Sequence, residues 1–263
     1  METSQAQGRT ENVSGIEMYY EIRGEGEPLV LLHGFTGSGA DWSLVFKNPP
    51  EQFRLIAPDL RGHGRSTNPS ARFTFRQSAL DVFALLDRLQ IDRFKAIGLS
   101  AGGKTLLHMA TQQPARIEAM VLVSATHYFP EQARAVMRQM TAESQSDEEW
   151  RLMRQRHKHG DDQIRALLKQ GHDFSESFDD MNFTPPYLST ISARTLIVHG
   201  DRDPFYPINI PFEIHSAIPR SYLWIIPNGG HGPIFGELMG SGETTQHFAE
   251  TAIEFLQGKW ERQ

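Results

Sequence analysis

The sequence predicts an α/β protein with a mostly parallel central sheet and helices on both of its faces. Three observations support this prediction: short continuous apolar runs that suit buried strands, helix-period segments between them, and glycine-rich turns after several of the runs. Strands that alternate with helices need crossover connections, which make neighbouring strands parallel and place the helices on the sheet faces. The chain of 263 residues suffices for one large domain, or for a domain with a modest insertion.

The first half of the chain supplies four of the expected strands. Residues 1 to about 13 are polar, and we expect them to form a frayed end. The strand candidates are IEMYYEI at 16–22, LVLL at 29–32, FRLIA at 53–57 and FKAI at 94–97. Before the last of them, apolar side chains recur at helical spacing, which predicts a helix with one buried stripe: Phe75, Ala79, Val82, Leu86 and Leu89.

The second half contains a change in composition that predicts an insertion. A strand candidate at 120–123 is followed by residues 127–187, which carry charged, helix-favouring runs and few strand signals. We expect this segment to form a helical cap (lid), with residues 1–126 and 188–263 forming one core domain. Sheet and helix patterns then resume, with strands expected at 195–198 and 222–226 and helices at 208–217 and 244–257.

Composition and charge exclude several classes of function. The chain has no cysteine, so it has no disulfide, thiolate metal site or cysteine nucleophile. The net charge of −6 argues against a nucleic-acid partner. No apolar run approaches the ~18 residues of a membrane span, and the polar N-terminus lacks the apolar core of a signal peptide. We therefore expect a cytoplasmic protein that binds neither membrane nor nucleic acid.

A metal site is also not expected. The only metal-like cluster is formed by His157, His159 and His172 in the predicted cap. A His-x-His pair with no further ligands nearby is typical of a solvated helix face.

The most informative stretch is FKAIGLSAGGKTLLHMA at 94–110. An apolar strand candidate ends in GLSAG at 98–102, and a helix-forming run follows at once. This is the context of a nucleophile elbow, G-x-S-x-G, in which Ser100 lies in a strained turn above the sheet edge. Side chains at positions 98 and 102 would crowd the neighbouring backbone, so glycine is needed there. The N–H of Ala101 is left free at a helix N-terminus, where a developing negative charge is favoured.

The same stretch also fits a second motif. GLSAGGKT at 98–105 matches G-x-x-x-x-G-K-T, the phosphate-binding loop of a nucleotide binder. That interpretation needs a magnesium-binding aspartate at the end of a later strand. The strand at 120–123 ends in Ser124, and the strand at 195–198 is followed by a histidine and a glycine before any aspartate. We therefore favour the nucleophile and interpret Lys104 as an ordinary residue of the first helical turn.

Other polar loops follow other strands of the predicted sheet. Because the carboxyl ends of parallel strands meet at one edge, we expect Phe35, Ser100, Asp203 and His231 to converge there. The order Ser, Asp, His is the chain order of the α/β-hydrolase triad. With HGFTGSG, DLRGHGRS, GLSAGG, GDRDPFYP and NGGHG in this order, the sequence resembles the α/β-hydrolase fold family. The resemblance covers the chain except for the predicted cap and the first dozen residues.

The resemblance implies a role for each of these residues. Ser100 would be the nucleophile, His231 the base that takes its proton, and Asp203 the acid that orients the imidazole. The backbone N–H groups of Phe35 and Ala101 would form the oxyanion hole.

Several neighbours are alternatives for these roles. Asp201 competes with Asp203, but the family's spacing after Gly200 favours Asp203. His33, His127 and His199 compete with His231. We interpret His33 as a brace of the oxyanion loop and His199 as a buried core residue. We expect His127 to contact the substrate at the cap entrance. The loop with Asp59, Arg61 and His63 is interpreted as structural.

The expected substrate is a small-to-medium apolar ester or lactone. Aromatic and methionine side chains of the cap and loops favour an apolar acyl group or ring. The candidate substrate-binding residues are Phe35, His127, Phe129 and Phe205. The resemblance implies a carboxylesterase-like serine hydrolase that forms an acyl-enzyme and needs no cofactor. Hydrolysis of a C–C bond in diketone ring-cleavage products is the alternative within the same fold, because GLSAGG also resembles the elbow of that group.

Overall fold

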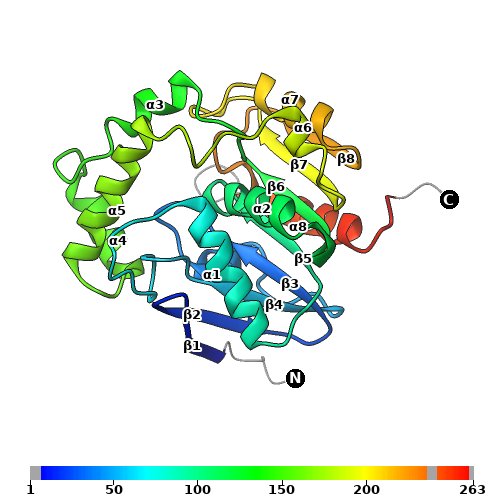
Figure 1. Cartoon of the computed structure of the whole chain (residues 1–263), viewed down its shortest axis with the longest axis horizontal. Helices are drawn as coiled ribbons and strands as arrows, with labels where there is room; N and C mark the ends of the chain where they lie inside the picture. The colour runs from blue at the N-terminus through cyan, green and yellow to red at the C-terminus, as the bar shows by residue number, and fades with distance from the viewer. Residues whose placement is uncertain (1–6, 236–241, 261–263) are drawn as a thin grey trace.

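The computed structural model describes residues 7–235 and 242–260, and the eight strands in these ranges form one sheet (Figure 1). The strand order is β1-β2-β4-β3-β5-β6-β7-β8. The pairs β1–β2 and β2–β4 are antiparallel, and all other neighbours are parallel, so the mostly parallel sheet is confirmed. The strands are β1 Gln7–Val13, β2 Ile16–Arg23, β3 Glu27–Leu32, β4 Phe53–Pro58, β5 Phe94–Leu99, β6 Ile117–Val123, β7 Arg194–Gly200 and β8 Ser221–Ile226.

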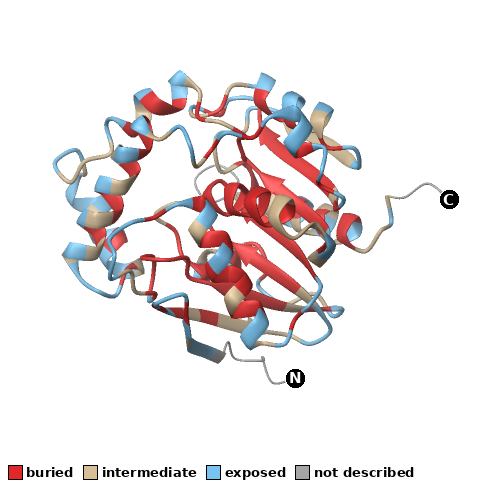
Figure 2. Cartoon of the chain, in the orientation of Figure 1, coloured by how far each residue is buried: buried red, intermediate tan, exposed pale blue. Residues whose placement is uncertain are grey.

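Strand β3 shows why the central strands read as continuous apolar runs. Leu29 and Leu31 belong to one apolar cluster, whereas Val30 and Leu32 belong to another on the opposite face of the sheet. Both faces are covered, so alternation between apolar and polar residues is lost. Figure 2 shows the central strands and α2 as the most buried part of the molecule. The face of Val30 and Leu32 is covered by α1 Phe75–Arg88, α2 Ala101–Gln112 and α7 Asn209–Ala217. The face of Leu29 and Leu31 is covered by α8 Gly242–Leu256 and the short helix η1 Gly39–Ser43.

The expectation of a frayed N-terminal end is wrong for residues 7–13. They form β1, which pairs with β2 in register from Gln7↔Ile22 to Val13↔Ile16. Ser14 and Gly15 join the two strands with positive φ values of 47° and 78°, as a tight hairpin turn requires. This edge strand has the polar sequence QGRTENV and therefore carries no apolar pattern. Residues 1–6 lie outside the described part of the chain.

The predicted cap segment, 127–187, contains helices that extend beyond the sheet (Figure 1). Phe174 and Met181 of this segment share one apolar cluster with Phe75 and with strand residues such as Met120. The last helix crosses the boundary predicted at 187, and the division into cap and core stays a prediction. The elements are α3 Glu131–Met137, α4 Asp147–Arg156, α5 Asp161–Asp173, η3 Phe174–Glu176 and α6 Pro185–Leu188.

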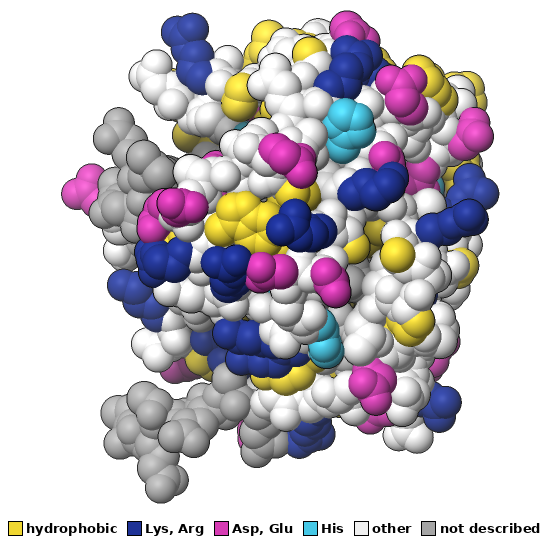
Figure 3. All heavy atoms as spheres, turned by 90° about the vertical axis from the view of Figure 1, so that its left-hand side faces the viewer, with side chains coloured by type: hydrophobic (Ala, Val, Ile, Leu, Met, Phe, Trp, Pro, Cys, Tyr) yellow, Lys and Arg dark blue, Asp and Glu magenta, His cyan; other side chains and the backbone are white. Residues whose placement is uncertain are grey.

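Figure 3 shows the outer face of the molecule on the side of α4 and α5. Lys and Arg side chains are interspersed with Asp and Glu, and a small hydrophobic patch lies among them. Neither sign of charge dominates this face, as is usual for a solvated surface. Within the described ranges, no helix combines the length and the apolar character needed to cross a membrane.

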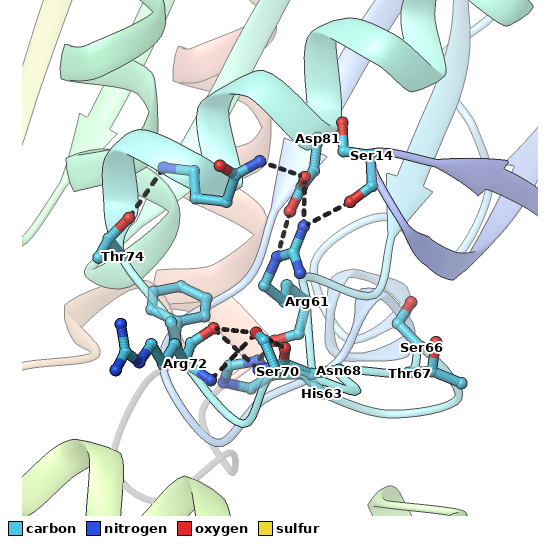
Figure 4. A network of polar contacts seen from close by, with 12 residues as sticks. Ser14, Arg61, His63, Ser66, Thr67, Asn68, Ser70, Arg72, Thr74 and Asp81 are labelled. Atoms are coloured by element: carbon cyan, nitrogen blue, oxygen red, sulfur yellow. Dashed lines mark hydrogen bonds and ion pairs between the residues drawn. The ribbon is translucent and has the colours of Figure 1, made fainter.

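A buried ion pair anchors the loop that follows β4 (Figure 4). Arg61 donates from Nε and Nη2 to the two carboxylate oxygens of Asp81 on α1, each at 2.7 Å. Nη2 also donates to the carbonyl oxygen of Ser14, at 3.2 Å. The side chains of Arg61 and Asp81 are 6% and 0% exposed. The pair therefore joins this loop to α1 and to the β1–β2 turn, which fits the structural role expected for Arg61.

We predict that Arg61→Met lowers the free energy of unfolding by about 3–5 kcal/mol, because it leaves the buried Asp81 carboxylate without its partner. Urea denaturation followed by circular dichroism measures the change. Arg93→Met is the control, since it breaks an ion pair with Glu118 in which the arginine side chain is 66% exposed. That variant should differ from the wild type by less than about 1 kcal/mol. Equal losses in the two variants would contradict the prediction.

Candidate active site

Ser100 lies between β5 and α2, at the carboxyl end of a central strand. Its φ of 48° and ψ of −103° are strained for a residue with a side chain. Helix α2 begins at the next residue, so the strand–turn–helix context predicted for the elbow is present. The turn holds the Ser100 hydroxyl at the edge of the sheet where the other strand-end loops meet.

Two glycines allow α2 to approach the sheet. A Cβ at position 98 would lie 2.5 Å from the carbonyl carbon of Gly102, and a Cβ at position 102 would lie 2.1 Å from the carbonyl oxygen of Leu32. Real Cβ atoms do not come so close to backbone, so a side chain at either position would push α2 away. The N–H of Gly102 donates to the carbonyl oxygen of His33 at 3.0 Å, which fastens the loop after β3 to the first turn of α2.

Asp203 and His231 reach Ser100 from the loops after β7 and β8. His231 Nε2 lies 2.8 Å from Ser100 Oγ, and His231 Nδ1 lies 2.8 Å from Asp203 Oδ2. Asp203 Oδ1 accepts the N–H groups of Phe205 at 2.8 Å and Tyr206 at 3.1 Å. The alternative acid, Asp201, is exposed. The structure therefore brings Ser100, His231 and Asp203 together as a continuous hydrogen-bonded chain.

The surroundings of Asp203 keep its carboxylate ionised. Its side chain is fully buried, and burial by itself would raise its pKa. The hydrogen bond and charge of His231, with the two backbone N–H groups, outweigh burial and lower the pKa of Asp203 below its usual value. An ionised Asp203 can orient the imidazole and stabilise a positive charge on it.

Two backbone N–H groups are available beside Ser100. Within the described residues, neither the N–H of Phe35 nor that of Ala101 donates to a backbone or side-chain acceptor of the protein. Ala101 is the first residue of α2, where the helix dipole favours negative charge. The bond from Gly102 to His33 holds the loop that carries Phe35 beside this helix end. This arrangement suits the binding of an oxyanion.

Comparison with known proteins agrees with this geometry. A family model described as the alpha/beta hydrolase fold matches residues 27–143. The human protein named Serine hydrolase BPHL is 30% identical over 228 residues, which cover 83% of this chain and 78% of that protein. The chain belongs to the α/β-hydrolase fold family.

Two solved structures of α/β-hydrolase architecture are similar to this chain over almost its whole length. A mutant form of CumD, a meta-cleavage product hydrolase from Pseudomonas fluorescens IP01, has a TM-score of 0.76 at 23% identity and covers 95% of this chain and 98% of its own. Est816, described as an N-acyl homoserine lactone degrading enzyme, has a TM-score of 0.72 at 26% identity and covers 95% and 99%.

The residues predicted to bind substrate lie in different surroundings in this α/β hydrolase. The ring of Phe205 packs against His231, with the centroids 4.5 Å apart. Phe35 and Phe129 each contact the ring of Phe174, in an aromatic cluster between the sheet and the predicted cap. His127 points at α7 instead, where its Nε2 lies 3.2 Å from a carboxylate oxygen of Glu213.

Two other histidines of the α/β hydrolase make contacts that suit the structural roles expected for them. His33 Nε2 accepts the N–H of Leu60 at 2.9 Å, which braces the loop after β3 against the loop after β4. His199 is buried, and its Nε2 lies 3.0 Å from the carbonyl oxygen of Tyr206. Burial lowers the pKa of both histidines, that of His33 to about 3, so both stay neutral at physiological pH.

The expectation of a solvated helix face is wrong for His157. This residue follows α4 and is buried, and its Nδ1 accepts the N–H of Gly64, at 2.9 Å, from the loop after β4. Burial lowers the pKa of His157 to about 3, and the neighbouring His63 and Arg156 act in the same direction. His159 is exposed, as expected. Within the described ranges, no three histidine, cysteine or acidic side chains are grouped to hold a metal ion.

Two residues next to Ser100 were not predicted to belong to the site. Lys104 is only 3% exposed, and its Nζ donates to the hydroxyl of Tyr206 at 2.8 Å. A hydrogen-bond interaction with Ser100 counteracts part of the rise that burial causes in the pKa of Tyr206. One sequence signal could have assigned Lys104 to the site. Residues four apart lie on the same face of a helix, so Lys104 is on the same side of α2 as Ser100.

We predict that Gly102→Ala destabilises the α/β hydrolase by about 1–3 kcal/mol or more, because the new methyl group collides with the backbone of β3. Thermal and urea unfolding measure this effect. Gly242→Ala is the matched control, because among the described residues no atom beyond its chain neighbours and its own helix backbone lies within 4 Å of a Cβ built at that position. It should leave stability within about 1 kcal/mol of the wild type. Unchanged stability in Gly102→Ala would contradict the close approach.

We predict that the free energy of unfolding falls as the pH drops below about 6.5, the ordinary pKa of histidine. In that range the unfolded chain takes up protons that the buried, neutral His33, His63 and His157 do not. His157→Asn should reduce the loss of stability between pH 7 and pH 5, because an amide oxygen can accept the Gly64 N–H without titrating. His159→Asn makes the same substitution at an exposed position and is the control for the substitution itself. Urea titrations at each pH test both, and parallel curves for wild type and His157→Asn would overturn the assignment.

Proposed function

We propose that this protein hydrolyses a carboxylic ester or a lactone through an acyl-enzyme formed on Ser100. The observation that supports this proposal most directly is the chain of two 2.8 Å contacts from Asp203 through His231 to Ser100. A serine hydroxyl is a weak nucleophile near neutral pH, so a base within hydrogen-bond distance is the essential feature of the site.

In the first half of the reaction, Ser100 Oγ forms a bond to the carbonyl carbon of the substrate while His231 Nε2 accepts the hydroxyl proton. The C=O bond becomes a C–O⁻ bond, and the negative oxygen is placed to accept hydrogen bonds from the N–H groups of Phe35 and Ala101. The bond from the carbonyl carbon to the leaving oxygen then breaks. The proton on His231 passes to that oxygen, so an alcohol leaves and Ser100 carries the acyl group.

In the second half, water takes the place of the alcohol. His231 accepts a proton from the water while the water oxygen forms a bond to the acyl carbon. The bond from that carbon to Ser100 Oγ then breaks, and His231 returns the proton to Oγ. The products are the carboxylic acid and the free enzyme. Asp203 holds the imidazole in one tautomer throughout and stabilises its protonated form.

The aromatic cluster beside the site supports an apolar acyl group or ring as the body of the substrate. Phe205 lies against His231, and Phe35 and Phe129 contact Phe174 of the predicted cap. We propose that the segment 127–187 covers the substrate as a cap. Est816 is described as acting on a lactone, and a lactone is a cyclic ester that the same steps would open. The likeness to CumD, at 23% identity, extends to the fold alone.

We predict that the wild type hydrolyses short-chain p-nitrophenyl esters and that Ser100→Ala lowers kcat by about 10⁴-fold or more, because no nucleophile remains. Release of p-nitrophenol measures the rate. Ser124→Ala is the matched control: Ser124 also follows a central strand with a positive φ, of 47°, and its hydroxyl is buried. This control should keep wild-type activity.

Full hydrolysis by Ser100→Ala would overturn the proposal. A panel of esters, lactones and diketone ring-cleavage products then separates the bond types. Turnover of a diketone by the wild type, with no turnover of any ester or lactone, would replace ester hydrolysis by C–C bond hydrolysis.

A further inference from the structure

The motif GLSAGGKT contains a lysine that the proposed reaction does not use. Lys104 stands one helical turn after Ser100, and its side chain is buried. A buried ammonium loses its hydration, and this is costly unless a charge or hydrogen-bond acceptors replace the water. The surroundings of this lysine therefore indicate what it is built to bind.

Aromatic rings enclose the Lys104 ammonium. Its Nζ lies 4.8 Å from the ring centroid of Phe75, 5.2 Å from that of Phe129 and 5.3 Å from that of Tyr206. These rings stabilise a cation but accept no conventional hydrogen bond. Of the three N–H donors of the ammonium, one is used on the hydroxyl of Tyr206.

The nearest carboxylates are engaged elsewhere. Asp203 binds His231 and two backbone N–H groups, and Asp180 accepts the backbone N–H groups of Phe75 and Arg76. Their charges favour the ammonium from a distance, yet burial lowers the pKa of Lys104 to about 7. Across the described ranges, Lys104 forms no ion pair and has Tyr206 as its only hydrogen-bond partner. Two of its donors thus remain for a bound molecule.

The position of the ammonium relative to the nucleophile is defined by Tyr206. The buried phenol accepts the hydrogen bond from Lys104 Nζ, and its ring lies 5.3 Å from the imidazole ring of His231, centroid to centroid. The backbone N–H of Lys104 donates to the carbonyl oxygen of Ser100 at 2.9 Å, and side chains four residues apart at such a turn have Cβ atoms about 5–6 Å apart. Consider an acyl group attached to Ser100 that carries a carboxylate. If the carboxylate lies two or three carbons beyond the acyl carbonyl carbon, its oxygen would reach Lys104 Nζ.

We propose that Lys104 and Tyr206 form a subsite that binds a carboxylate on the acyl part of the substrate, two or three carbons from the scissile carbonyl group. This inference rests on the proposed ester hydrolysis and adds the class of acyl group. A carboxylate supplies both the negative charge and the acceptors that the buried ammonium lacks. The aromatic rings then hold the carbon chain, and the single polar anchor sets its direction.

The test compares monoethyl succinate and monoethyl glutarate with neutral ethyl esters in which an isopropyl group replaces the carboxylate. The measured quantity is the ratio of kcat/KM for the acidic ester to kcat/KM for its neutral partner. In Lys104→Met this ratio should fall about 10- to 100-fold, the effect expected for a lost hydrogen bond to a charged group. Tyr206→Phe should lower the ratio less, because the ammonium keeps its charge.

Lys95→Met is the control for removing a buried lysine. Lys95 lies at the other end of β5, where it pairs with Glu27, and its loss should leave the ratio unchanged. Thermal unfolding of each variant shows that it is folded. A wild-type enzyme with no preference for the acidic esters, or an unchanged ratio in Lys104→Met, would overturn the subsite.

The pH dependence of the same ratio is a second readout. The groups that face Lys104 are Asp203, Asp180 and Tyr206, and the contacts of Asp203 with His231 and two backbone N–H groups lower the pKa of Asp203. An effect of pH on the chain from Asp203 to Ser100 applies to both esters and cancels in the ratio. The ratio should fall as the pH rises above about 7 in the wild type and stay flat in Lys104→Met. A flat ratio in the wild type would contradict the role of the ammonium.

A binding measurement tests the carboxylate subsite independently of the proposed ester hydrolysis. Calorimetric titration of monoethyl glutarate into Ser100→Ala, with and without Lys104→Met, requires no turnover. Affinity that depends on Lys104 would support the subsite even if the wild type hydrolysed no ester. Equal affinity in the two variants would overturn the subsite and leave ester hydrolysis untouched.

Discussion

The close approach of α2 to the sheet is the constraint on which the rest of the site depends. Without side chains at positions 98 and 102, the first turn of the helix lies against the backbone of β3 and β5. In the turn between β5 and this helix, Ser100 has a strained backbone conformation, and its hydroxyl lies at the strand ends. The close approach also brings the free N–H of Ala101 beside the loop of Phe35. One steric condition therefore positions both the Ser100 hydroxyl, our proposed nucleophile, and the N–H groups that we propose would bind an oxyanion.

The polar interior around this edge is organised by hydrogen bonds between loops that are far apart in the chain. Asp59 accepts the N–H groups of Gly39 and Arg65, and His33 accepts that of Leu60. Such buried groups are stabilising only when they are paired, so each loop depends on its neighbours for its conformation. The predicted cap takes part in the same interior, because His157 accepts the N–H of Gly64. The sheet edge and the helices over it are thus one packed unit.

Much of the fold was predictable from local patterns because buried parallel strands carry a strong signal. All seven expected strands are present, since each is a short apolar run flanked by turn residues. Strand β1 was not predicted, because an edge strand with a polar sequence is recognised only through its pairing with a neighbouring strand. The burial of His157 was not predicted for a similar reason. A histidine in a charged segment is expected to be solvated, and His157 is buried only because the loop after β4 packs against it.

By itself the sequence determined the order of strands and helices, the elbow at Ser100 and the candidates Asp203 and His231, because these depend on spacing within short segments. Only the tertiary structure decided that these three side chains meet and that Asp201 stays in solvent. The sequence indicated only that Lys104 lies in the first turn of the helix after Ser100, and its surroundings were decided by the tertiary structure. Its enclosure by aromatic rings brings in Phe75 and Phe129 from other segments of the chain, and its bond to Tyr206 spans 102 positions. Burial and charge pairing are properties of such long-range contacts, and no local pattern encodes them.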